Sequence, residues 1–263
     1  MRKYLAGALA AFMALACLNV AVAGADVQSI NAKLTPKKLS KKKYKPATIA
    51  IAIETQNNDQ AGDSPPEFQN QPPAATRTIV DFPKNMKFDT SAAPHCKVSD
   101  AALANTTTEQ ATNLCGKKSI VSVGEQPGPG FPKKTGAIQR VGSAVGFTDY
   151  TVVVTAFNGQ KKNTLFLHAR VQALPITAVL VGKLTKNQKA SLSNGPSLDV
   201  TVPVLAAGGI KTFKTTVKHG KYVQARCKQK NMTFGARSTY DSGPTTDHTP
   251  TKATTKSKCT QKK

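Results

Sequence analysis

Four histidines are the side chains of this 263-residue chain best suited to acid–base chemistry: His95, His168, His219 and His248. None stands at the spacing from a serine, cysteine or aspartate that known nucleophilic motifs use. His168 lies in the apolar run around Leu167 and would share a strand face with Phe166 and Arg170. We interpret it as a packed or surface histidine rather than a catalytic base.

The serines and carboxylates form no catalytic motif either. A nucleophile elbow has the pattern Gly-x-Ser-x-Gly, but residues 142–146 read Gly-Ser-Ala-Val-Gly, with the serine one position early. Asp59, Asp63 and Glu67 lie in a polar stretch at 56–75, and we interpret them as solvated charges rather than the carboxylate pair of a glycosidase. No phosphate-binding glycine loop, dinucleotide fingerprint or calcium loop is present. We expect a non-catalytic protein without a cofactor, with an extracellular hydrolase assembled from distant residues as an alternative.

The first 23 residues have the pattern of a bacterial secretory signal peptide. Arg2 and Lys3 precede an apolar run, and Ala-Val-Ala at 21–23 forms a small-x-small cleavage site. This is the only stretch that approaches the roughly 20 apolar residues of a membrane span, so no transmembrane span is expected in the mature chain. Cys17 follows a distorted lipobox, which leaves a lipid anchor as an alternative to release.

Four of the five cysteines lie beyond the signal segment: Cys96, Cys115, Cys227 and Cys259. An even number of cysteines in an exported chain predicts disulfides. Three pairings are possible, and we favour the two that join neighbours in sequence, the first with the second and the third with the fourth. There is no Cys-x-x-Cys spacing, and no metal site is expected.

The net charge of the chain is +23, and it would be +21 without Arg2 and Lys3. Such a field favours anionic partners. The mature chain would carry 30 Lys and only 5 Arg, and Lys is a hydrated point charge without the bidentate fork that reads bases. We therefore expect electrostatic association with anionic envelope polymers or acidic glycans and no specific nucleic acid partner. The expected contacts form the densest basic run: Lys37, Lys38, Lys41, Lys42 and Lys43.

Apolar residues that alternate with small or polar ones predict strands along most of the mature chain. Ile and Ala alternate over 48–54, and Asn158-Gly159 starts a hairpin loop between the apolar runs at 151–157 and 165–171. Closely spaced strands with polar turns predict a mainly β fold, an antiparallel two-layer β-sandwich. A short helical insert is expected at about 98–115, where Ser99 could cap a helix.

These patterns divide the chain into four parts. A signal peptide at 1–23 is followed by a basic extended N-terminal arm at 24–46, a sandwich domain at 47–244 and a Thr/Lys-rich tail at 245–263 that Cys259 would hold in place. Oligomeric state cannot be predicted. A ligand- or carbohydrate-binding module is a further alternative, but the chain has no Trp to form a sugar platform, which leaves Tyr44, Tyr222 and Tyr240 as the candidates.

Several segments together resemble an uncharacterised group of secreted, Lys-rich bacterial proteins with a β-rich domain and two disulfides. The resemblance is carried by the segments 34–46 (LTPKKLSKKKYKP), 155–159 (TAFNG), 198–203 (LDVTVP) and 222–227 (YVQARC), and by the helical insert that ends at Cys115-Gly116. No activity is known for this group. The resemblance therefore implies export and a β-rich fold, and nothing about a ligand.

Overall fold

The computed structural model describes residues 27–56, 75–124, 136–143, 146–171, 174–186, 191–202, 210–217, 220–240 and 250–262. The predicted signal peptide lies outside these residues, as do Cys17, Asp59, Asp63, Glu67, His219 and His248. Strands make up most of what is described, which confirms the mainly β prediction.

The chain forms the following elements. The strands are β1 (Val27–Thr35), β2 (Lys38–Ser40), β3 (Lys45–Pro46), β4 (Thr48–Gln56), β5 (Ala75–Asp81), β6 (Met86–Phe88), β7 (Ile120–Gly124), β8 (Gly136–Ser143), β9 (Gly146–Asn158), β10 (Thr164–Val171), β11 (Thr177–Thr185), β12 (Ser197–Thr201), β13 (Ile210–Val217), β14 (Val223–Ala225), β15 (Asn231–Tyr240), β16 (Thr251–Lys258) and β17 (Thr260–Lys262). The helices are α1 (Asp100–Leu103) and α2 (Thr108–Cys115), with 3-10 turns at Thr90–Ala92 and Lys117–Ser119.

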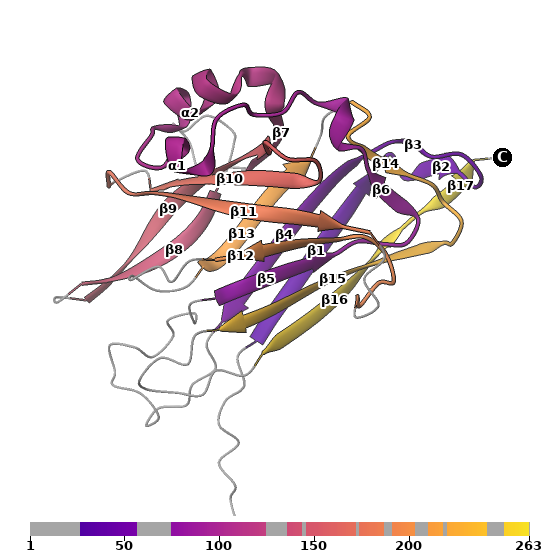
Figure 1. Cartoon of the computed structure of the whole chain (residues 1–263). Coiled ribbons are helices and arrows are strands. Elements are labelled where there is room, and N and C mark those ends of the chain that lie inside the picture. Colours follow the sequence, from indigo (N-terminus) through magenta and orange to yellow (C-terminus); the bar gives the residue numbers. More distant parts are fainter. Residues whose placement is uncertain are drawn as a thin grey trace, which may run out of the picture.

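A 12-stranded antiparallel sheet forms the body of the molecule. Its order is β1-β4-β13-β7-β9-β10-β11-β12-β5-β15-β16, and β8 pairs with both β13 and β9. A three-stranded sheet, β3-β14-β6, and a parallel pair, β17-β2, lie together at the end of the molecule that carries the C-terminus (Figure 1). Many neighbours in the large sheet are distant in sequence, so the fold depends on long-range pairing.

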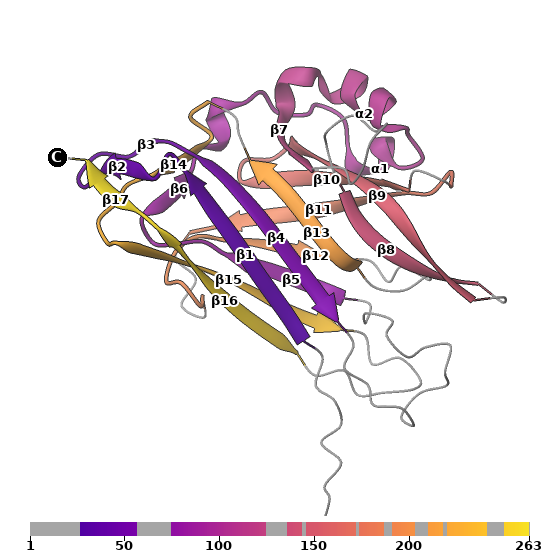
Figure 2. The ribbon, with the colours of Figure 1, turned by 180° about the vertical axis from the view of Figure 1, so that it is seen from behind.

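The large sheet curls until it nearly closes into a barrel. Its two end strands, β1 and β16, lie side by side (Figure 2). At this junction the Leu34 N–H donates a hydrogen bond to Ser257 Oγ at 3.2 Å, and Gln28 Nε2 donates to Ser238 Oγ on β15 at 2.7 Å. The sheet is therefore not the two-layer sandwich that we predicted. Period-two alternation marks the buried face of each strand, but it does not say whether that face meets a second layer or the far wall of one curled sheet.

Alternation along the strands separates an inner from an outer face of this sheet. Leu165 and Leu167 of β10 lie on the inner face, whereas Phe166 and His168 lie on the outer face beneath the helices. The same period holds on β4, whose isoleucines are buried against the other strands of the main core. Leu34, Ile49 and Phe234 are completely buried there, and they come from β1, β4 and β15.

Two segments predicted as an arm and a tail each contribute a full strand to the large sheet. β1 pairs with β4 along its whole length, from Val27 opposite Gln56 to Thr35 opposite Thr48. β16 pairs with β15 in the same way, and its lysines are exposed while Thr251 and Ser257 are buried. The Thr/Lys composition suggested a tail, but β-branched threonines with lysines on the solvent side also suit an edge strand.

The helical insert forms where it was predicted and packs on the outer face of β9, β10 and β11 (Figure 1). Ser99 Oγ accepts a hydrogen bond from the Ala102 N–H at the start of α1, and Thr107 with Gln110 forms a reciprocal capping box at the start of α2. The predicted Cys96–Cys115 disulfide closes the insert. Leu103 is completely buried in the cluster that joins the insert to the sheet.

We expect the Cys227–Cys259 disulfide, which the structure also contains as predicted, to stabilise the fold by restricting the unfolded chain. It closes a loop with a sequence separation of 32 residues. The double variant Cys227→Ser/Cys259→Ser should lose about 3 kcal/mol of unfolding free energy, measured by urea denaturation without reductant. An unchanged midpoint and slope would show that the unfolded chain is already compact around this loop.

Candidate functional site

The predicted lysine contacts become part of a larger basic surface, which we call the basic end. It consists of the segments 37–46, 84–88, 221–230 and 256–262, which together contain fifteen basic residues and no acidic one. Lys37, Lys38, Lys41, Lys42 and Lys43 are all exposed there. The basic residues of the other three segments could not be assigned to the same surface from sequence, because the segments are up to about 200 positions apart.

Backbone hydrogen bonds hold the four segments together. The Cys227 N–H donates to the Ser40 carbonyl at 2.8 Å, the Thr260 N–H to the Lys37 carbonyl at 2.7 Å, and the Arg226 N–H to the Asn85 carbonyl at 3.0 Å. Pairing of β17 with β2 and of β14 with β3 and β6 adds further bonds. The Cys227–Cys259 disulfide joins two of the segments covalently. The basic end therefore has a defined backbone rather than being a loose lysine-rich tail.

Tyr44 belongs to the basic end, and two cations approach its ring. Lys87 Nζ is 5.0 Å and Arg226 Cζ is 4.7 Å from the centre of its ring. Attraction of both cations to the ring stabilises a close approach of like charges that would otherwise repel. Two cations therefore already interact with this ring, which makes Tyr44 a poor platform for a sugar.

The other two candidate tyrosines lie elsewhere. Tyr222 is only 1% exposed, and burial raises the pKa of its hydroxyl well above the ordinary value. Tyr240 is at the end of β15, where its hydroxyl is 2.6 Å from Thr251 Oγ1. The three tyrosines thus form no common aromatic surface, and the structure gives no support to a sugar platform built from them.

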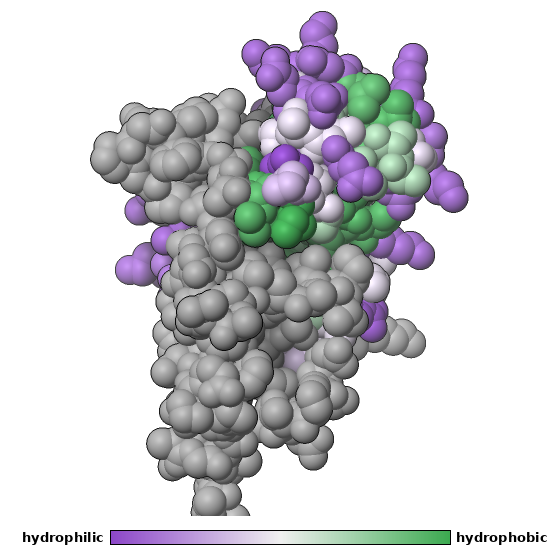
Figure 3. Space-filling view, turned by 90° about the vertical axis from the view of Figure 1, so that its left-hand side faces the viewer, coloured by the Kyte–Doolittle hydropathy of each residue, from purple (hydrophilic) through white to green (hydrophobic). Residues whose placement is uncertain are grey.

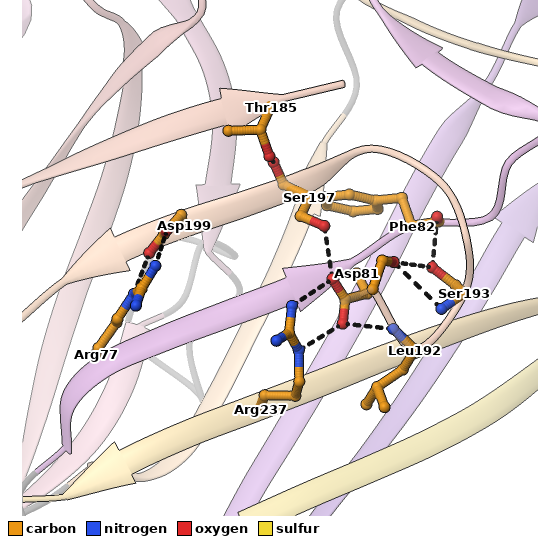
Figure 4. A network of polar contacts seen from close by, with 10 residues as sticks. Arg77, Asp81, Phe82, Thr185, Leu192, Ser193, Ser197, Asp199 and Arg237 are labelled. Atoms are coloured by element: carbon orange, nitrogen blue, oxygen red, sulfur yellow. Dashed lines mark hydrogen bonds and ion pairs between the residues drawn. The ribbon is translucent and has the colours of Figure 1, made fainter. Parts of the chain in front are cut away.

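A network of buried polar groups on the outer face was not predicted from sequence. Asp81 is completely buried, and its carboxylate accepts hydrogen bonds from Ser197 Oγ at 2.6 Å, from the Leu192 N–H at 3.1 Å and from Arg237 Nε at 2.9 Å (Figure 4). Beside it, Arg77 forms a bidentate pair with Asp199 and lowers the pKa of that carboxyl. Ser197 is itself completely buried and has no access to a substrate. The network therefore fastens the 191–195 loop and β15 to β5.

His168 is completely buried between β10 and the helical insert. Its Nε2 is 3.0 Å from Thr106 Oγ1 and 3.2 Å from the Thr106 carbonyl oxygen. The Thr106 hydroxyl donates to the Leu103 carbonyl, so it accepts from His168 and Nε2 carries the proton. Burial is the main cause that lowers the pKa of His168, and the positive charge of Arg170 lowers it further. His168, which we interpreted as a packed or surface histidine, is therefore packed; its lowered pKa favours the neutral form, and its contacts with Thr106 fasten the insert to the sheet.

The described residues contain no group of His, Cys, Asp and Glu that could hold a metal ion. Within the same residues, no helix has the length and apolar character needed to cross a membrane. Of the three other histidines, His95 has its Nδ1 within hydrogen-bond distance of the Gly159 carbonyl oxygen, whereas His219 and His248 lie outside the described residues. The central residues 144 and 145 of the elbow-like segment also lie outside them.

Comparisons with known proteins give no family. No protein-family description and no curated protein matches the chain. Among solved structures, the crystal structure of collagen adhesin (CNA) from S. aureus is similar over 90% of this chain and 94% of that chain, with 9% identity and a TM-score of 0.18. Similarity at this level supports no conclusion about fold or function.

We expect the substitution Asp81→Asn to destabilise the protein by about 3 kcal/mol, because it removes the completely buried negative charge that pairs with the mostly buried Arg237 guanidinium. Asp199→Asn is the matched control. Its partner Arg77 is 52% exposed, so that ion pair is worth at most about 1 kcal/mol. Chemical denaturation of both variants tests this. Equal losses of unfolding free energy would show that the buried Asp81 network stabilises the protein no more than the exposed ion pair does.

We expect stability to fall in mild acid because of His168. A group with a lowered folded pKa binds its proton more readily in the unfolded chain, so its contribution is complete above the ordinary value of 6.5 and is lost as the pH falls below it. The loss is at most about 1.4 kcal/mol per pH unit. The difference in unfolding free energy between wild type and His168→Gln, measured from pH 7.5 to 5, should shrink as the pH falls. A constant difference would contradict this.

Proposed function

We propose that this chain is an exported, non-catalytic protein that associates with anionic cell-envelope polymers or acidic glycans through its basic end. The observation that supports this proposal is the union of four basic segments on one backbone framework without an acidic residue among them. A polyanion passing over this surface would meet many cations within the roughly 10 Å screening length of 0.1 M salt. Affinity would arise from many weak contacts.

The residue types at the basic end favour diffuse electrostatic attraction over sequence-specific recognition of a nucleic acid. Fourteen of the fifteen basic residues of the basic end are Lys, and Arg226 is the exception. Ammonium groups on flexible stems attract phosphate, carboxylate and sulfate alike, whereas sequence-specific nucleic acid binding relies on Arg forks and base contacts. We therefore propose that the ligand of the basic end is a polymer with repeating anionic groups.

The two disulfides agree with an oxidising environment outside the cytoplasm. The signal segment at 1–23 remains the sequence argument for export, and Cys17 the argument for a lipid anchor. Within the described residues, the absence of a histidine paired with a carboxylate gives the hydrolase alternative no support.

The test is co-sedimentation of the mature protein with purified bacterial cell envelopes, before and after removal of their anionic polymers, over a salt series. One variant replaces Lys37, Lys38, Lys41, Lys42 and Lys43 by Gln. The control variant replaces five exposed lysines outside the basic end by Gln: Lys97, Lys117, Lys118, Lys161 and Lys183. Both variants lose the same net charge.

Binding should disappear when the polymers are removed and should weaken steeply with salt. The basic-end variant should bind at least tenfold more weakly than the control variant, because only its missing charges lie on the proposed surface. Equal weakening of both variants would assign the effect to net charge alone. Absence of binding at low salt would overturn the proposal.

A further inference from the structure

The curled sheet encloses an apolar cavity that the basic end does not use. Its volume is about 190 Å³, and residues from most strands of the large sheet line it. Its origin is visible in the strand register: Ala169 of β10 stands between Val154 of β9 and Ala178 of β11, and Ala156 stands opposite Leu167. Small side chains at these inner positions leave space where larger ones would fill a barrel.

Most of the lining surface is apolar, and none of the described residues that form it is Lys, Arg, Asp, Glu or His. This is notable in a chain with a net charge of +23. A charged group placed in such a space would lose its hydration without gaining a partner. The cavity is somewhat larger than a dry engineered cavity of about 150 Å³ that binds benzene. It therefore suits an uncharged apolar molecule.

One end of the cavity carries an unusual polar group. Tyr222 lines the cavity and is almost completely buried, and its hydroxyl has no hydrogen-bond partner among the described residues. It lies next to Phe88, with ring centres 6.4 Å apart, and Phe88 in turn contacts Phe82 at 4.6 Å. Buried hydroxyls are almost always hydrogen-bonded, so one without a partner points to a missing acceptor or donor.

The opposite end of the cavity lies near solvent. Ile176, just before β11, lines the cavity and is 48% exposed. Figure 3 shows apolar surface among hydrophilic side chains on this face, the side of the molecule on which β10 leads into β11 in Figure 1. Thr78 of β5 and Phe82, which directly follows this strand, both line the cavity, and four residues of extended chain span about 13 Å. The space is therefore elongated.

We propose that the cavity binds an uncharged, medium-length alkyl compound whose single oxygen accepts a hydrogen bond from the Tyr222 hydroxyl. The raised pKa keeps this hydroxyl protonated and able to donate. An alcohol or a carbonyl compound satisfies it without bringing charge into the apolar lining. A fatty carboxylate would lose its hydration at a site without a cation, so it should bind more weakly than the corresponding alcohol.

The test uses the neutral fluorophore N-phenylnaphthylamine, displaced in competition by decanol or by decanoate at pH 8, in high salt that suppresses attraction to the lysines. The fluorophore should bind at one site, and decanol should displace it at least tenfold more effectively than decanoate. Because the basic end is not involved, its five-Gln variant should behave like wild type. Failure of envelope binding and failure of this proposal are therefore distinguishable.

Three variants test the location of the site. Ala178→Phe fills the cavity and should weaken fluorophore binding at least tenfold, whereas Val181→Phe, on the exposed outer face of the same strand, should leave it within twofold. Tyr222→Phe should retain the fluorophore but weaken competition by decanol about three- to tenfold, the effect of one hydrogen bond. Ala169→Val replaces Ala178→Phe if circular dichroism shows that the latter does not fold. Equal competition by decanoate, or fluorophore binding unchanged in the cavity-filling variant, would overturn the proposal.

Discussion

Curling of one antiparallel sheet until its first and last strands meet is the constraint on which the other features depend. β1 and β16 come from opposite ends of the described chain and lie side by side. Side-chain acceptors such as Ser257 take part in the junction. An edge strand with free backbone groups invites pairing with other chains, and the approach of the two end strands protects both. The same closure creates an interior with its own lining.

The separation of charge from apolar surface follows from this closure. Among the described residues that line the cavity there is no Lys, Arg, His, Asp or Glu, whereas lysines occupy the outer face and the basic end. The buried carboxylate of Asp81 lies on the outer face, where Arg237, Ser197 and a backbone N–H satisfy it. A charge in the interior would have had no such partners. High net charge and an uncharged interior are therefore compatible in one domain.

Local signals predicted the local structure. Alternation at 48–54 and 165–171, the cap at Ser99 and the two cysteine pairs all correspond to observed features. The layering could not be predicted, because β13 lies between β4 and β7, and β5 between β12 and β15, and no local pattern encodes such pairings. For the same reason, the sequence predicted only one of the four segments of the basic end, the one that contains the lysines at 37–43. Asp81 and Tyr222 carried no motif, since their significance comes from burial alone.

The segment 221–230 shows why the basic end and the apolar cavity have to be studied with different variants. Lys221 is exposed at the basic end, while its neighbour Tyr222 is buried and lines the cavity. β14 follows at once, and its pairing with β3 and β6 fixes both side chains on one backbone. A substitution in this segment that shifts the strand would change the charge distribution and the cavity together. The lysines at 37–43 do not line the cavity, so charge can be altered there without touching the interior, and Ala178 allows the reverse.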